Sequence, residues 1–131
     1  MVGIVIVSHM VSIAEGVRDM AKKVSKQDLV VIAAGGAADG SFGTDNVKIC
    51  KAIVQADDGD GVVVVTDVGS SVISAGIAVQ DLDMNLHRRV RIADAPIVEG
   101  AIAAASEASK NSNVDEVLKA AELAKSVSKK A

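Results

Sequence analysis

Four apolar runs of strand length alternate with stretches of helical periodicity along this chain. The runs cover residues 2–8, 28–34, 61–66 and 89–93, and each is rich in Val and Ile with few polar interruptions. Strands covered on both faces are continuously apolar, whereas half-exposed strands alternate. The pattern predicts an α/β fold, a single doubly wound domain over residues 1–131 with a four-stranded, mainly parallel sheet and helices on both faces.

The first two helices are predicted from their start signals and apolar stripes. Ser12 and Glu15 resemble a capping box, and Thr44 with Asp45 marks the second start. The expected buried stripes are Ile13, Val17, Met20, Ala21 and Val24 on the first helix and Val47, Cys50, Ile53 and Val54 on the second. The acidic turn at 57–61 lacks the ligand spacing of a calcium loop, and we interpret it as a turn.

Two later helices are apolar almost all the way round. They are predicted at about 70–83 and 97–108, and a last helix begins at Asn113, with Lys125, Lys129 and Lys130 near its end. A small domain cannot cover the whole surface of an apolar helix by itself. We therefore predict a homodimer built on one or both of these helices.

The ends of the predicted strands are where function is expected. If the second strand lies on one side of the first and the third on the other, the strand order is 2-1-3-4. The winding then reverses between the first and third strands, and open parallel sheets bind ligands at such a point. Ser8-His9 ends the first strand and Thr66-Asp67 ends the third, so His9 and Asp67 are expected side by side.

This pair of residues has a specific chemistry. A carboxylate that accepts a hydrogen bond from one imidazole nitrogen fixes the tautomer and leaves the other nitrogen as an unprotonated nucleophile. Gly69, Ser70 and Ser71 follow Asp67 and begin the next helix, where free N–H groups, hydroxyls and the helix dipole attract anions. The combination predicts that His9 captures a phosphoryl group. The sequence has no P-loop pattern.

The amino-acid composition excludes some classes of binding partner and indicates a cellular location. The formal net charge is −3, and there is one Phe, Phe42, with no Trp or Tyr. Neither a basic footprint nor aromatic stacking for nucleic acid is present, so none is expected as a partner. One cysteine excludes an internal disulfide, and no signal peptide or membrane-spanning run is visible, so a cytoplasmic protein without membrane insertion is expected.

Phe42 lies in the unusual loop GGAADGSFG at 35–43 and has two possible interpretations. Its side chain either folds back on Val47 as a hydrophobic staple, or stands near the predicted site and contacts a protein partner. The sequence leaves both open.

Several stretches together resemble the mannose-type IIA domains of the bacterial phosphotransferase system. They are IVIVSHMVSIAEGV, FGTDNVKICKAI, VVVVTDVGSSVISAGIAVQDL and RIADAPIVEGAIAAA, and the likeness covers roughly residues 1–108. Within that family the similarity is greatest to the branch that donates phosphoryl groups to dihydroxyacetone kinase. The sugar-transporting members usually have a Gly-Gly-Ser-Pro turn where this chain has Gly69-Ser70-Ser71, which favours the kinase branch.

The resemblance implies roles for particular residues and partners. It implies phosphorylation of His9, orientation of the ring by Asp67, and phosphate contacts from Gly69, Ser70 and Ser71. It also implies a dimeric phosphotransferase that takes phosphate from HPr and passes it to ADP on the nucleotide-binding subunit of dihydroxyacetone kinase, with no metal or cofactor. Glu99 either lines a partner surface or complements the dipole of its helix.

Alternative functions remain. The chain could serve a sugar transporter by passing phosphate to a IIB domain, or it could be a receiver-like or anion-sensing module. A receiver needs an acidic pair after the first strand, where this chain has Ser8-His9. A Ser-His-Asp hydrolase is disfavoured because adjacent strand residues point to opposite faces.

Overall fold

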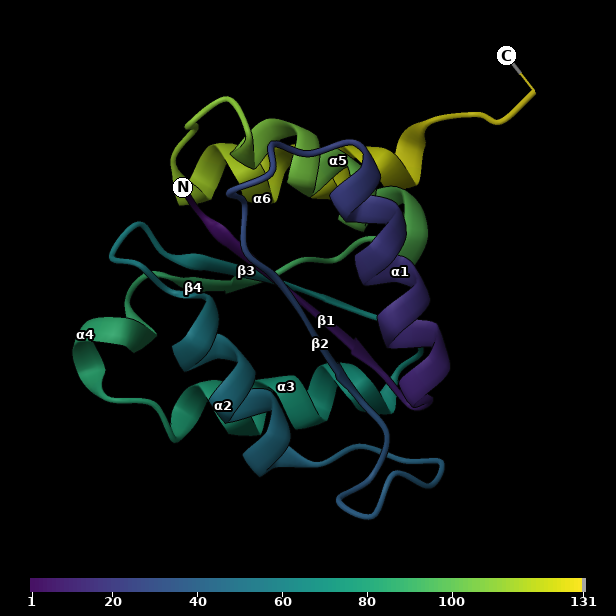
Figure 1. The fold of residues 1–131 in the computed structure, drawn as a ribbon, viewed down its shortest axis with the longest axis vertical. Helices are drawn as coiled ribbons and strands as arrows, with labels where there is room; N and C mark the ends of the chain where they lie inside the picture. The colour runs from purple at the N-terminus through teal and green to yellow at the C-terminus, as the bar shows by residue number, and fades with distance from the viewer. Residues whose placement is uncertain (131) are drawn as a thin grey trace.

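A four-stranded parallel sheet forms the centre of the computed structural model, which describes residues 1–130 (Figure 1). Its strands are β1 (Gly3–Ser8), β2 (Val31–Gly35), β3 (Val62–Thr66) and β4 (Val90–Ile92). They lie in the order β2-β1-β3-β4, and every neighbouring pair is parallel. The predicted α/β class and strand order are therefore confirmed.

Helices cover both faces of the sheet. The face shown uppermost in Figure 1 carries α1 (Val11–Lys23), α5 (Ile97–Ala108) and α6 (Val114–Leu123), and the other carries α2 (Asn46–Ala56) and α3 (Ser70–Gln80). A short α4 (Met84–His87) precedes β4, and a 3-10 turn, η1 (Ala124–Ser126), follows α6. Within residues 1–130, no helix combines the length and apolarity needed to cross a membrane.

The central strand β1 explains why the apolar runs are continuous. Ile4 and Ile6 pack into the core under α1, α5 and α6, whereas Val5 and Val7 pack into the core under α2 and α3. All four side chains are completely buried. Successive residues of a strand point to opposite faces, so a strand with helices on both sides needs apolar residues at every position.

The first helix begins earlier than predicted. Its N-cap is Met10, which makes no side-chain capping bond, and Ser12 is an exposed residue inside α1. The Ser8 hydroxyl accepts the Met10 N–H at 3.1 Å, which binds one of the free donors at the start of the helix. The capping box predicted at Ser12 was therefore wrong. Ser8, at the end of the preceding strand, accepts the N–H of the N-cap residue Met10 instead.

Two other predicted helix starts are confirmed. The Asp45 carboxylate accepts the Lys48 N–H at 2.9 Å at the start of α2. Asn113 and Glu116 form a reciprocal capping box at the start of α6, which ends at Leu123, before the C-terminal lysines. Oxygen-bearing side chains at these positions satisfy backbone N–H groups that have no helical acceptor.

The predicted apolar stripes are rotated relative to the faces that the structure buries. In α1 the buried residues are Ala14, Val17 and Ala21, whereas Ile13 and Met20 are exposed. The helices contribute mostly alanines to the core on this side, and such small side chains allow helices to approach the sheet closely. The predicted stripe of α1 is therefore confirmed at Val17 and Ala21 and wrong at its larger residues, including Val24, which is exposed.

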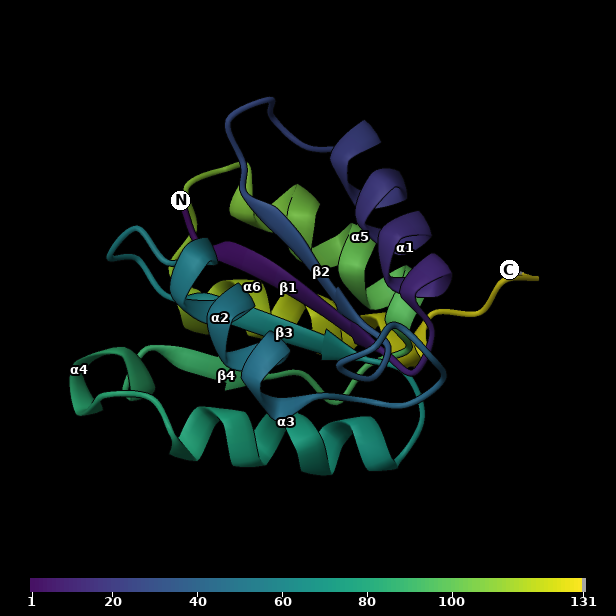
Figure 2. The ribbon, with the colours of Figure 1, turned by 60° about the horizontal axis from the view of Figure 1, so that its bottom comes forward.

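The two all-round apolar helices have different surroundings. α5 lies between α1 and α6, and its Gly100, Ala101, Ala104, Ala105 and Ala108 are buried, whereas Ile102 and Ala103 are only partly buried (Figure 2). The outer face of α3 stays open, and Val72, Ile73 and Ile77 are exposed there. The predicted helix at 70–83 ends at Gln80, and Asp83 caps the separate helix α4.

Candidate functional site

His9 lies at the carboxyl edge of the sheet, bound to Asp67. Its Nδ1 is 3.0 Å from Asp67 Oδ1, and its backbone N–H donates to Asp67 Oδ2 at 2.9 Å. The end of β3 is itself joined to β1, because the Asp67 N–H donates to the Val7 carbonyl at 3.1 Å. The structure therefore brings the two predicted residues together, and the parallel pairing of β1 with β3 sets their positions.

The other nitrogen of the imidazole faces the start of α3. Nε2 of His9 lies 2.6 Å from Oγ of Ser70. Because a carboxylate only accepts hydrogen bonds, the contact with Asp67 selects the tautomer with hydrogen on Nδ1. In the neutral ring, Nε2 then carries a lone pair, to which the Ser70 hydroxyl donates.

Asp67 is a largely buried carboxylate with several donors. Burial raises the pKa of Asp67, but hydrogen bonds from the His9 N–H, the Ser71 and Ser8 hydroxyls and the imidazole together hold that pKa below its ordinary value. Ser8 Oγ donates to Oδ2 at 2.9 Å. A carboxylate that stays ionised is a permanent acceptor for Nδ1–H and a counter-charge for an imidazolium.

The N-terminus of α3 provides donors beside Nε2. Among residues 1–130, the N–H groups of Gly69 and Ser70 have no hydrogen-bond acceptor, and the Ser70 side chain is exposed. Free N–H groups at a helix start, together with the helix dipole, favour an anion. These two residues therefore present a cradle for negatively charged oxygens next to the imidazole.

Ser71 is arranged differently from Ser70. Its side chain is completely buried, its N–H donates to the Val68 carbonyl at 2.9 Å, and its hydroxyl lies 2.7 Å from the same carbonyl. That hydroxyl is also within reach of the Asp67 carboxylate, and with one hydrogen it donates to one acceptor at a time. The structure thus directs the Ser71 hydroxyl at the Val68 carbonyl and near the Asp67 carboxylate, whereas the Ser70 hydroxyl lies at the imidazole.

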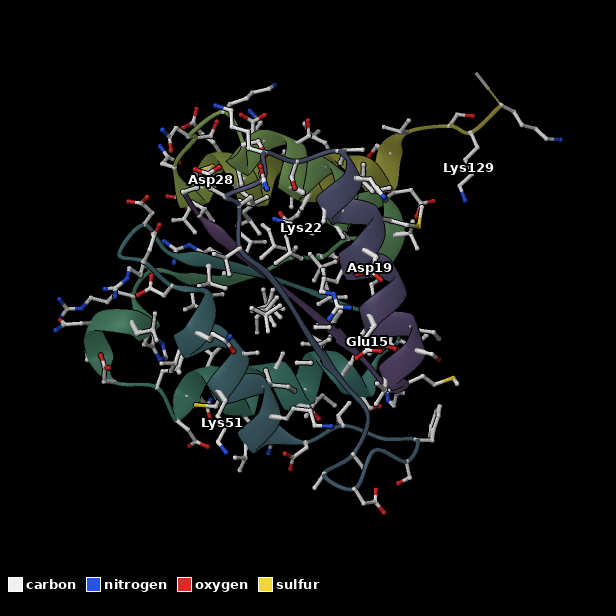
Figure 3. All side chains as sticks on the ribbon, in the orientation of Figure 1. Glu15, Asp19, Lys22, Asp28, Lys51 and Lys129 are labelled. Atoms are coloured by element: carbon white, nitrogen blue, oxygen red, sulfur yellow. The ribbon has the colours of Figure 1, made fainter. Side chains whose placement is uncertain are left out.

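Phe42 lies next to His9, as one of its two predicted interpretations expected, and its contact with a protein partner stays a prediction. Its ring stacks on the imidazole of His9 with the centroids 5.2 Å apart and the planes 26° from parallel. Its side chain is 74% exposed. Glu15, labelled on α1 in Figure 3, lines a surface pocket together with Phe42, Met10 and Val11.

Ser8 and Lys48 have structural roles at the site that sequence reasoning missed. Lys48 Nζ donates to the carbonyls of Gly35 and Ala37, each at 2.9 Å, at the start of the loop that carries Phe42. Ser8 connects Asp67 with the Met10 N–H. The only signal for either residue is position, since Ser8 precedes His9 and Lys48 falls in the first turn of the helix after the loop.

Glu99 lies outside this network of contacts. Its carboxylate pairs with Lys129 at 2.8 Å, and the hydrogen bond from Lys129 lowers the pKa of Glu99. Both residues line a groove of about 470 Å³ between α5, α6 and the C-terminal segment, where Figure 3 shows Lys129. The cavity next to Asp67 is a different one, lined by Val72, Asp94 and their neighbours.

The fold and the site define an α/β domain that presents an oriented, carboxylate-bound histidine at a helix N-terminus. Within residues 1–130, no group of three His, Cys, Asp or Glu side chains could hold a metal ion. Residues 3–121 match the family model described as the fructose IIA component of the phosphotransferase system, EIIA-man. The chain belongs to this family.

Individual relatives support the same assignment. The chain is 37% identical over 127 residues to the phosphoryl donor subunit DhaM of the PEP-dependent dihydroxyacetone kinase of Providencia stuartii, a match that covers 95% of this chain but 27% of that protein. It is 34% identical to the DhaM subunit of dihydroxyacetone kinase 2 of Listeria innocua, a match that covers 90% of this chain and 94% of that subunit.

A solved structure agrees with the fold. The crystal structure of EF1359, described as a protein of unknown function, has a TM-score of 0.80 and 31% identity, and the match covers 93% of this chain and 94% of that one. The chain spans about a quarter of the Providencia relative and nearly all of the Listeria subunit.

Proposed function

We propose that the chain is a phosphohistidine carrier. Nε2 of His9 accepts a phosphoryl group from HPr and passes it to ADP held by the nucleotide-binding subunit of dihydroxyacetone kinase. The observation that carries the proposal is the position of the imidazole, with Nδ1 bound to Asp67 and Nε2 facing Ser70 at the start of α3. Membership of the IIA family supports the same chemistry.

The proposed step is an in-line transfer. The Nε2 lone pair forms a bond to phosphorus while the bond between phosphorus and the donor atom breaks, and the electron pair of that bond stays with the donor. The proton on Nδ1 remains in place, so the ring becomes positively charged and faces the Asp67 carboxylate. The Ser70 hydroxyl and the N–H groups of Gly69 and Ser70 bind the phosphoryl oxygens.

The proposed acceptor rests on the relatives. The Providencia and Listeria proteins are both named as phosphoryl donor subunits of a PEP-dependent dihydroxyacetone kinase. The Listeria subunit is matched over nearly its whole length. The same acceptor is therefore proposed for this chain.

One labelling experiment tests the carrier function. The protein is incubated with radiolabelled phosphoenolpyruvate, the first enzyme of the phosphotransferase system and HPr, and the label is challenged with acid and with alkali. An acid-labile, alkali-stable label is expected on the wild type and absent from His9→Gln. His87→Gln changes the other histidine and should keep the label. Label that persists in His9→Gln would contradict the proposal.

A sugar-transport role is the second candidate, because the matching family model is described as a fructose IIA component. In that role the phosphoryl group passes to a IIB domain. The two acceptors are separated by mixing the purified phosphoprotein either with the kinase's ADP-loaded subunit or with a IIB domain. We expect the phosphoprotein to lose its label to the ADP-loaded kinase subunit and to keep it in the presence of the IIB domain.

A receiver-like role fits the geometry poorly. A receiver aspartate must offer a free carboxylate oxygen as nucleophile. Both oxygens of Asp67 already accept hydrogen bonds, from His9 and from Ser8. An anion sensor would keep the α3 cradle but would not need His9, so the labelling experiment also tests that alternative.

The open face of α3 is the surface proposed for the homodimer. Val72, Ile73 and Ile77 are exposed on a helix that is otherwise packed against the sheet. Contiguous exposed apolar surface of this kind favours association. On α5 no large apolar side chain is exposed, although Ile102 and Ala103 line the groove beside α6, so α3 is the better candidate of the two predicted helices.

A further inference from the structure

The position of Phe42 is not explained by burial. It is the only Phe, Trp or Tyr in the chain, and its side chain is 74% exposed. Large apolar side chains gain stability mainly by leaving water. The ring is stacked on the His9 imidazole, with the two centroids 5.2 Å apart.

The loop that carries Phe42 is built to hold it there. Gly43 donates its N–H to the His9 carbonyl at 2.9 Å, and Gly36 donates to the Ser8 carbonyl at 3.0 Å, so both ends of the loop are joined to the residues around the imidazole. Gly36 has φ +79°, a conformation that favours glycine. Inside the loop, Ala37 donates to Ser41 at 2.8 Å.

The proposed phosphotransfer changes the charge of the ring under Phe42. The form that accepts the phosphoryl group is the neutral imidazole, with hydrogen on Nδ1 and a lone pair on Nε2. Afterwards Nε2 is bonded to phosphorus and the Nδ1 hydrogen is retained, so the ring carries a positive charge beside the negative phosphoryl group. The hydrogen bond from Ser70 to the Nε2 lone pair is lost at the same time, since that lone pair now forms the bond.

We propose that Phe42 is a positioning residue that stabilises the phosphorylated, cationic imidazole of His9 through the face of its ring. A cation within about 6 Å of an aromatic centroid is attracted by the negative face of the ring. Asp67 binds the edge of the imidazole at Nδ1, and Phe42 covers one of its faces, so the two interactions do not compete. This inference rests on the proposed carrier function.

The proposal concerns an equilibrium and is separable from partner docking. A residue that only contacts the donor protein changes the forward and reverse transfer rates by the same factor. A residue that stabilises the phosphorylated state changes the equilibrium constant of transfer from HPr. The equilibrium constant is therefore the quantity to measure, and rates alone do not decide.

The experiment compares wild type with Phe42→Tyr, Phe42→Leu and Phe42→Ala. Each protein is mixed with radiolabelled phospho-HPr until the distribution of label is constant, and the equilibrium is approached again from the phosphorylated variant and unlabelled HPr. Thermal unfolding checks that the variants are folded. We expect them to be, because the Phe42 side chain is mostly exposed and contributes little to the core. The equilibrium constant should fall about two- to fivefold in the leucine and alanine variants, and Phe42→Tyr should match wild type.

Other results would overturn the inference. A leucine variant equal to wild type would show that an apolar cover is sufficient, and altered rates at a constant equilibrium would show a docking role. Unchanged equilibrium constants in all three variants would also exclude it. If the wild type takes no phosphoryl group from HPr, the proposed function fails and this proposal with it, so the two failures are distinguishable.

Discussion

Asp67 holds His9 at two points, with one carboxylate oxygen on the backbone N–H and the other 3.0 Å from Nδ1. The first bond fixes the chain as it leaves β1, and the second fixes the ring on that chain. The imidazole is therefore oriented relative to the sheet as well as to its own backbone.

Replacing Asp67 with Asn should slow phosphorylation of His9 strongly. An amide can donate a hydrogen bond to Nδ1 and so select the wrong tautomer, and it supplies no counter-charge for the ring. We expect a loss of about 10²- to 10⁴-fold in the initial rate of label uptake from phospho-HPr. Asp19→Asn, at the exposed residue labelled on α1 in Figure 3, is the matched control and should keep the wild-type rate. Equal rates in the two variants would contradict the role of Asp67.

Ser70 and Ser71 should respond differently to alanine substitution. Ser70→Ala removes the hydroxyl that lies 2.6 Å from Nε2, so the rate of phosphoryl uptake should fall about 10- to 100-fold with little change in stability. Ser71→Ala removes a buried hydroxyl and should lower the free energy of unfolding by about 1 kcal/mol. Uptake rates and urea denaturation of both variants check this, and the reverse pattern would contradict the assignment.

Lys48→Ala should loosen the loop at 36–43. Its ammonium group donates to the Gly35 and Ala37 carbonyls, and removal leaves both without this donor. With about 1 kcal/mol lost, the Gly43 amide, which donates to the His9 carbonyl, should exchange its hydrogen roughly fivefold faster. Lys51→Ala on the next turn of α2, at an exposed residue, is the control. An unchanged exchange rate of the Gly43 amide in Lys48→Ala would show that the hydrogen bonds from Lys48 do not stabilise the loop.

The Asp57–Arg89 pair should make stability depend on pH at the acid end. The hydrogen bonds from the Arg89 guanidinium lower the pKa of Asp57 below its ordinary 3.8, and burial opposes them. A lowered folded pKa contributes stability that is present above the unfolded value and is lost as the pH falls through the folded value. Asp57→Asn should therefore lower the free energy of unfolding at pH 7 but much less near pH 2.

Urea denaturation at the two pH values measures that difference. Asp60→Asn, at an exposed neighbour in the same turn, serves for comparison and should show a smaller dependence. If Asp57→Asn lowers the free energy of unfolding by the same amount at both pH values, the pairing with Arg89 does not stabilise the folded chain.

Ile73→Asp should weaken the proposed homodimer. Ile73 is 67% exposed on the outer face of α3, so a charge there costs the monomer little but is unfavourable in an apolar interface. Sedimentation of the wild type should show a dimer, and that of the variant a shift toward monomer at the same concentration. Ser106→Asp, at an exposed position of α5, should leave the dimer intact. A wild type that sediments as a monomer would contradict the proposed interface.

The sheet and the His9–Asp67 contact could be predicted because they depend on strong local signals. Continuous Val and Ile runs define strands covered on both sides, and parallel strands with a winding reversal bring the ends of the first and third strands together. Neither the strands nor the order in which they lie requires knowledge of how the side chains pack. The same is true of the helix starts at Asp45 and Asn113, where the capping residue is adjacent to the helix it caps.

Other features depended on contacts between distant segments. The start of α1 was missed because Ser8, a strand residue, binds the Met10 N–H. The buried stripe of α1 was misplaced because alanines, and not the larger Ile13 and Met20, contact the sheet. The position of Phe42 could not be chosen from the sequence, since it depends on Lys48 and Gly43 bonding to carbonyls elsewhere in the chain.

The parallel pairing of β1 with β3 makes the proposed phosphoryl uptake sensitive to the alignment of these two strands. Val7 of β1 lies opposite Thr66, the last residue of β3, and Asp67 follows Thr66 in the sequence. A slip of one residue would exchange the faces of every side chain in β3 and bring Thr66 or Val68 to the imidazole. Such a molecule could retain most of its secondary structure, yet it would lack the carboxylate. Phosphoryl uptake would then distinguish correctly aligned molecules from misaligned ones that spectroscopic measures of helix and strand content count as folded.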